Sequence, residues 1–150
     1  MRISLILAAA VLVTGLAANG AAPAPNLSRN GRPARVNYMT ECQGCHLPDG
    51  SGMTGKVPSL KNEISSFLTV EGGRQFLIQV PGSANSKLSD ADLAELINWI
   101  ITTMDKPAAG TFDPYTAAEV ASYRAQRLQE VTQVRERLVS RFAAEKPVQH

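Results

Sequence analysis

The apolar positions of this chain recur at intervals of three and four residues, which is the spacing of one face of an α-helix. One such segment begins at Ser89, an N-cap residue with Asp92 at the third helical position, a variant of the capping box. A lysine-proline pair at 106–107 ends it. Its apolar stripe comprises Leu93, Leu96, Ile97, Ile100 and Ile101.

Two earlier segments have the same spacing. Residues 34–45 predict a helix with Tyr38 and Cys42 on one face. Residues 62–80 predict two short helices on either side of Gly72-Gly73, with apolar residues that wall a pocket. We therefore expect an all-α fold.

The last part of the chain predicts an amphipathic helix of about thirty residues, which is long enough to need a partner for its apolar face. Thr116 and Glu119 form a capping box at its start. The face can pack on the chain's own core, or it can dock a partner protein or a second copy. Its apolar positions are Val120, Tyr123, Leu128, Val131, Val134, Leu138 and Phe142.

The N-terminus has the pattern of a secretory signal. An arginine is followed by an apolar run over 3–13 and then by small residues, which predicts a signal peptide over 1–20 with cleavage after Gly20 or a neighbouring residue. The run is shorter than a bilayer span, although an uncleaved anchor is the alternative. A proline-rich linker over 21–33, a helical domain over 34–106 and a helical extension over 107–150 complete the predicted organisation.

Composition fits one small exported domain. The chain has 150 residues, 44% of them hydrophobic but only 5% aromatic, so a buried prosthetic group would supply missing apolar bulk. The formal net charge of +2 is too weak to indicate nucleic-acid binding. After signal cleavage, no remaining stretch is expected to enter a membrane.

The chemistry of the sequence is concentrated in Cys42-Gln43-Gly44-Cys45-His46, the C-x-x-C-H signature of covalent haem attachment. Two thiols at this spacing can each add to a vinyl group of one porphyrin, and the adjacent imidazole can ligate its iron. A thioredoxin-like pair would need a β-α-β context. A structural zinc site would need four ligands, and a disulfide across so short a ring would be strained.

This motif resembles that of the class I c-type cytochromes, and the resemblance extends over about residues 34–105, including the "LSDADLAELINWI" segment. It implies a cytochrome c-like helical domain with one covalent haem c, with His46 as an axial ligand of the iron. It also implies that the Pro58 carbonyl accepts the Nδ1 proton of His46, that Leu60 packs on the porphyrin, and that Trp99 packs on the first helix.

The chain departs from the family in the loop before its last core helix, over 81–87, where the family carries a methionine ligand and this sequence has none. The sixth iron ligand is therefore unknown. The alternatives are Met53, Met104, Lys87, Asn85, His150, a water molecule or an open position.

Two functions follow from the resemblance. The first is a periplasmic one-electron carrier between redox proteins such as a dehydrogenase and an oxidase or reductase. No catalytic carboxylate pair or triad is recognisable, so we expect an electron-transfer protein rather than an enzyme. The second is a haem protein whose open sixth position binds a small gas or peroxide, as a sensor or enzyme. A polar pocket would favour the second, with Asn85, Ser86 and Gln79 as its polar residues.

Overall fold

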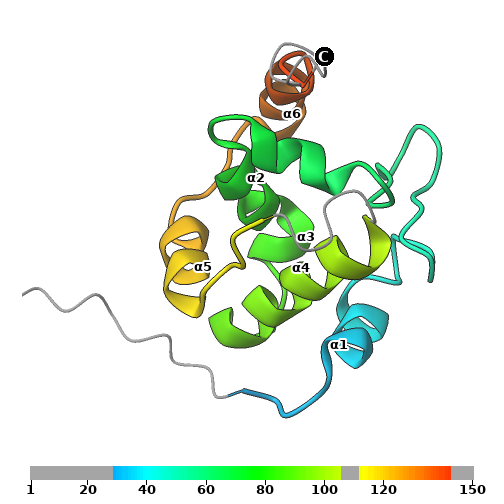
Figure 1. Cartoon of the computed structure of the whole chain (residues 1–150), viewed down its shortest axis with the longest axis vertical. Coiled ribbons are helices and arrows are strands. Elements are labelled where there is room, and N and C mark those ends of the chain that lie inside the picture. The colour runs from blue at the N-terminus through cyan, green and yellow to red at the C-terminus, as the bar shows by residue number, and fades with distance from the viewer. Residues whose placement is uncertain (1–28, 106–111, 143–150) are drawn as a thin grey trace, which may run out of the picture.

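The computed structural model describes residues 29–105 and 112–142. The predicted signal peptide and most of the predicted linker lie outside these residues. The all-α prediction is confirmed: the described residues form helices and no strand, apart from one isolated bridge between Met53 and Val57 (Figure 1). The helices are α1 (Ala34–Glu41), η1 (Ile64–Thr69, a 3₁₀ helix), α2 (Gly73–Gln79), α3 (Pro81–Ala84), α4 (Asp90–Met104), α5 (Ala117–Arg124) and α6 (Val131–Val139).

Helix α4 is the centre of the core. The Ser89 hydroxyl accepts from Asp92 N at 3.0 Å and donates to Asp92 Oδ2 at 2.7 Å, so the predicted cap is confirmed. All five residues of its predicted apolar stripe are buried. Helix α1 packs across it, and the Tyr38 and Trp99 rings lie 5.6 Å apart between their centroids. The expected contact of Trp99 with the first helix is therefore confirmed.

Helix α1 is shorter than predicted and ends at Glu41. The carbonyl of Tyr38 accepts from both Cys42 N at 2.9 Å and Gln43 N at 3.1 Å, so the i to i−4 ladder breaks at this point. The next turn is closed separately by His46 N donating to Cys42 O at 2.9 Å. The two cysteines therefore lie in a tight turn after the helix.

The two short helices predicted around Gly72-Gly73 are η1 and α2. Gly72 has a φ of +83°, a left-handed conformation that favours glycine. A Cβ on Gly73 would lie 1.7 Å from the carbonyl oxygen of Phe67, so the close approach of the two helices requires a glycine there as well. The turn stacks the Phe67 and Phe76 rings with centroids 5.1 Å apart.

The predicted long C-terminal helix is not continuous, because the structure divides it into α5 and α6. Two carbonyls at and just beyond the end of α5 accept hydrogen bonds from a residue of α2. The Gln79 side-chain amide donates to Tyr123 O at 3.4 Å and to Gln126 O at 2.8 Å. Residues 125–130 consequently bend around α2 instead of extending away from the core.

The apolar face of this C-terminal segment packs on the chain's own core. Val120 and Leu138 are buried, and the Phe142 ring meets Phe67 edge-on with centroids 4.8 Å apart. Figure 1 shows α5 beside α2 and α4, with α6 at the far end of α2.

A second set of contacts docks the segment that enters α5. Tyr115 exchanges two hydrogen bonds with the Asn98 side chain, at 2.7 and 3.0 Å, and its hydroxyl donates to Arg74 O at 2.9 Å. The Arg74 guanidinium lies over the Tyr115 ring, 4.1 Å from its centroid. It also donates to both carboxylate oxygens of Glu119, each at 2.8 Å.

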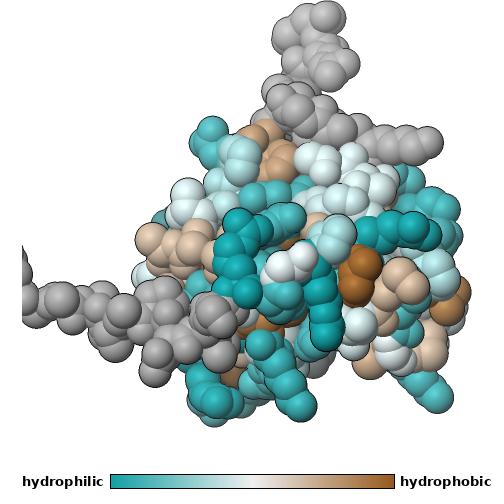
Figure 2. All heavy atoms as spheres, turned by 90° about the horizontal axis from the view of Figure 1, so that it is seen from below, coloured by the Kyte–Doolittle hydropathy of each residue, from teal (hydrophilic) through white to brown (hydrophobic). Residues whose placement is uncertain are grey.

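None of the helices in the described residues is long and apolar enough to span a bilayer. Figure 2 shows one face of the molecule, on which apolar residues lie in small groups among hydrophilic ones. The large apolar side chains that are exposed in the described residues are Val36, Met39, Leu47, Met53 and Val139.

Candidate functional site

A cavity of about 410 Å³ lies beside the C-x-x-C-H motif and is lined by Cys42, Cys45 and His46. Most of its wall is apolar and comes from the rest of the core. The loop after the motif contributes Pro58 and Leu60, and the helices contribute residues such as Phe67, Phe76, Leu93 and Ile97. A volume of this size, with a few convergent polar groups in an apolar wall, is typical of a cofactor site.

The two cysteines are free thiols. Burial raises the pKa of Cys42 to about 11, so this thiol is protonated at neutral pH. A thioredoxin-like pair depends instead on a thiolate of lowered pKa. Within residues 29–105 and 112–142, no three histidine, cysteine or acidic side chains lie close enough to share a metal ion.

His46 lines the cavity beside the two cysteines. Its Nδ1 atom is buried and has no hydrogen-bond partner. Burial lowers the pKa of the imidazole, which favours the neutral form that ligates metals. A buried nitrogen without a partner is costly. Iron would bind the other ring nitrogen, so the partner that Nδ1 lacks is a hydrogen-bond acceptor, such as the carbonyl that the resemblance assigns to it.

The expected hydrogen bond from His46 to the Pro58 carbonyl is not formed in this structure. The loop instead curls on itself through two bonds between Met53 and Val57, at 2.8 and 2.9 Å. This directs the carbonyls of Val57 and Pro58 toward Gly52, where a Cβ would lie 2.0 Å from the first oxygen and 2.6 Å from the second. Pro58 and Leu60 still line the same cavity as His46.

The turn that holds the motif is also fixed from α1. The Tyr38 hydroxyl donates to Leu47 O, the carbonyl immediately after His46, at 2.7 Å. Burial raises the pKa of Tyr38 to about 12, so the hydroxyl remains a donor at neutral pH. The sequence predicted only that Tyr38 shares a helical face with Cys42, because no spacing rule indicates this longer contact.

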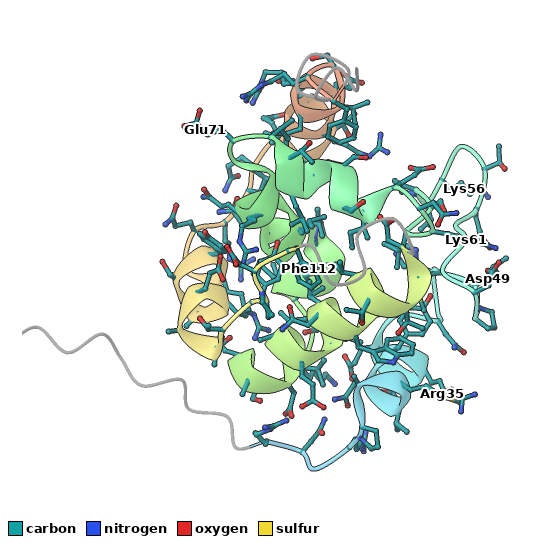
Figure 3. All side chains as sticks on the ribbon, viewed as in Figure 1. Arg35, Asp49, Lys56, Lys61, Glu71 and Phe112 are labelled. Carbon is teal, nitrogen blue, oxygen red and sulfur yellow. The ribbon has the colours of Figure 1, made fainter. Side chains whose placement is uncertain are left out.

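The rest of the loop after the motif is held on the surface. Figure 3 labels Asp49, Lys56 and Lys61 along it, and Lys61 Nζ donates to Asp49 Oδ2 at 3.1 Å. The pKa of Asp49 is held well below its usual range, first by the hydrogen bond from the Ser51 hydroxyl. Lys56 also lines the cavity, so a cation lies at its edge.

None of the four residues considered as a sixth ligand, Met53, Met104, Lys87 and Asn85, lines the cavity. Met53 is exposed. The sulfur of Met104 packs on the loop, since a Cβ on Gly50 would lie 2.6 Å from its Sδ atom. The further alternative, His150, lies outside the described residues.

The segment before α4 nevertheless forms part of the cavity wall, through Val80, Pro81, Gly82, Ser83 and Ser86. Of the three polar residues predicted for this wall, only Ser86 lines it. Its hydroxyl oxygen is buried without a hydrogen-bond partner. The Gln79 amide is engaged by the carbonyls beyond α5.

Helix α6 contributes Val131 and Arg135 to the cavity wall, which the sequence reasoning did not foresee. Val131 belongs to the predicted apolar stripe, so its burial had a signal in the spacing. Arg135 had none, because an arginine on an amphipathic helix is ordinarily at the surface.

Comparison with known proteins identifies the family. No family model matches the chain. It is 33% identical to cytochrome c-552 of Thermus thermophilus, over 62% of this chain and 86% of that protein. A cytochrome c-552 from a named strain of the same species is also 33% identical, over 62% of this chain and 76% of that protein.

The chain belongs to the c-type cytochromes. This family consists of haem-containing electron carriers. The residues of this cytochrome fit such a group, because two thiols, an imidazole whose neutral form is favoured by burial and a large apolar wall meet at one cavity.

Proposed function

We propose that this cytochrome is a class I, monohaem protein that carries one electron at a time between redox proteins in the periplasm. The observation that supports this most is the convergence of Cys42, Cys45 and His46 on one apolar cavity. Cys42 and Cys45 would each form a thioether to a single haem c, and His46 would be an axial ligand of its iron. Pro58 and Leu60 would face the group from the loop.

The bound haem would supply a one-electron couple, and the protein would supply its environment. Apolar side chains from η1, α2 and α4 form much of the cavity wall and would shield a bound haem from water on that side, which would reduce the rearrangement that accompanies a change of charge. The partners we propose are a periplasmic dehydrogenase on the donor side and an oxidase or reductase on the acceptor side. We propose no enzymatic reaction for the chain itself.

The proposed organisation retains the predicted boundaries. Residues 1–20 act as an export signal and 21–33 as a linker. Residues 34–106 form the haem domain, and 107–150 form a C-terminal extension, of which residues 112–142 pack back on it.

The direct test is the absorption spectrum of the full chain, made with a working haem-ligation system, in both redox states. We expect a sharp c-type spectrum after reduction and one haem per chain by mass under denaturing conditions. A colourless protein of unmodified mass would contradict the proposal.

A second function is favoured by one observation: none of the donor residues named for the sixth position in the described chain lines the cavity, while Ser86 presents an unpartnered hydroxyl there. The iron would then have an open position for a small gas or peroxide. Carbon monoxide distinguishes the two functions. Slow or absent binding to the reduced protein fits the carrier, and rapid, complete binding would replace it with the second function.

A further inference from the structure

The connection between α3 and α4 has few backbone hydrogen bonds of its own. Within the described residues, no backbone N–H donates to the carbonyls of Ser86 or Leu88. Unpaired carbonyls in a packed protein need other partners. This connection also edges the cavity, because its Ser86 lines the cavity next to the exposed Pro81 and Gly82 of α3.

The missing partners come from a single side chain, Arg124, at the end of α5. Its guanidinium donates to Ser86 O at 2.7 Å and to Leu88 O at 3.0 Å. It lies 3.4 Å from Ala84 O, the carbonyl that ends α3, through two of its nitrogens. It also donates to Asp90 Oδ1 at 2.8 Å, in the first turn of α4.

These contacts span the whole connection. The rigid fork of an arginine can hold several acceptors at once, whereas the single ammonium of a lysine cannot reproduce that geometry. The pair is also well shielded, since the Arg124 and Asp90 side chains are 15% and 14% exposed. Charge-assisted hydrogen bonds in such a setting are stronger than those at an open surface.

We infer that Arg124 is a positioning residue for the cavity: it fixes residues 84–90 and thereby makes the C-terminal extension control access to the cavity. This inference rests on the proposed function, because the cavity is taken to hold haem. Arg124 acts through the segment it holds, and it does not line the cavity itself.

The test compares Arg124→Gln, Arg124→Lys and Glu119→Gln in the full-length holoprotein. Glu119→Gln is the matched control, because it loosens the same helix from α2 by removing the pair with Arg74 without touching residues 84–90. The first readout is amide hydrogen exchange of residues 81–88. The second is the rate at which added imidazole binds to the oxidised protein.

For Arg124→Gln we expect both the exchange of residues 81–88 and the rate of imidazole binding to rise by about tenfold or more, because several charge-assisted bonds are lost together. Arg124→Lys should fall between this variant and the wild type. Glu119→Gln should leave both quantities near wild type.

The inference is overturned if Arg124→Gln leaves either quantity unchanged, or if Glu119→Gln raises both by the same factor. Haem content, measured for every protein, distinguishes failure of the proposed function from failure of the inference about Arg124. A wild-type chain without haem would refute the proposed function, whereas a haem-loaded Arg124→Gln protein with unchanged imidazole binding would refute only this inference. Should Arg124→Gln fail to fold, Arg124→Lys decides with the same two measurements.

Discussion

The two sides of the cavity are built in different ways. The side that carries the motif is held by short-range bonds, such as those between Met53 and Val57, by the contact of Tyr38 with Leu47, and by the packing of Met104 on Gly50. The side before α4 is held by Arg124, whose partners lie 34 to 40 positions away in the chain. Local sequence therefore specifies the chemistry of the site, while distant sequence specifies the shape of its edge.

The largest effect should come from breaking the chemistry on the motif side. We expect His46→Ala to abolish the native spectrum, because the iron loses an axial ligand. Cys42→Ala or Cys45→Ala should leave one thioether and retain haem less firmly. Spectra and denaturing mass measurements check both, and a native spectrum in His46→Ala would contradict the assignment of the ligand.

The shape of the motif side depends on Gly52. In Gly52→Ala, the new Cβ would lie 2.0 Å from Val57 O, so the loop must shift, and we expect a loss of roughly 2–3 kcal/mol in the free energy of unfolding. Gly44→Ala is the control, since a Cβ there has no neighbour within 4 Å and φ is not positive. Denaturant unfolding measures both, and equal losses would show that the loop is not this closely packed.

The free energy of unfolding should also depend on how α6 packs on the core. Leu138→Ala removes a buried side chain and should cost about 2–3 kcal/mol. Val139→Ala, at the exposed neighbouring position, should cost less than about 0.5 kcal/mol. Thermal unfolding of the two variants tests whether the C-terminal segment is an integral part of the fold, and a negligible cost for Leu138→Ala would show that it is not.

The smallest effect concerns pH. Hydrogen bonds from Arg74 lower the pKa of Glu119 below its ordinary value of 4.5, while burial opposes this shift. Because the folded pKa lies below the unfolded one, the pair stabilises the fold fully above pH 4.5 and loses this contribution as the pH falls through the folded value.

Glu119→Gln should therefore weaken the pH dependence of unfolding below pH 4.5, measured by denaturant titration at several pH values. Glu136→Gln removes an exposed carboxylate on α6 and serves as the control for the change in net charge. An unchanged slope in Glu119→Gln would show that the Arg74 pair does not stabilise the fold.

What could be predicted from the sequence follows the same division. The caps at Ser89 and Thr116 and the stripe on α4 are short-range signals, and the structure confirms them. The end of α1 at Glu41 and the division between α5 and α6 were not predicted. The first depends on two N–H groups that share the Tyr38 carbonyl, and the second on Gln79, which donates from another helix. The Pro58 bond was transferred from the family, and the curl of the loop over Gly52 explains its absence here.

The placement of Val131 and Arg135 in the cavity wall has a consequence for biosynthesis. The thiols and the imidazole emerge early from the ribosome, but the enclosure around them is complete only after the chain has been made as far as α6. In the proposed holoprotein, attachment of the haem and its enclosure would therefore be separable steps, and a chain that stops after α4 would present the two thiols in a cavity without the wall that α6 contributes.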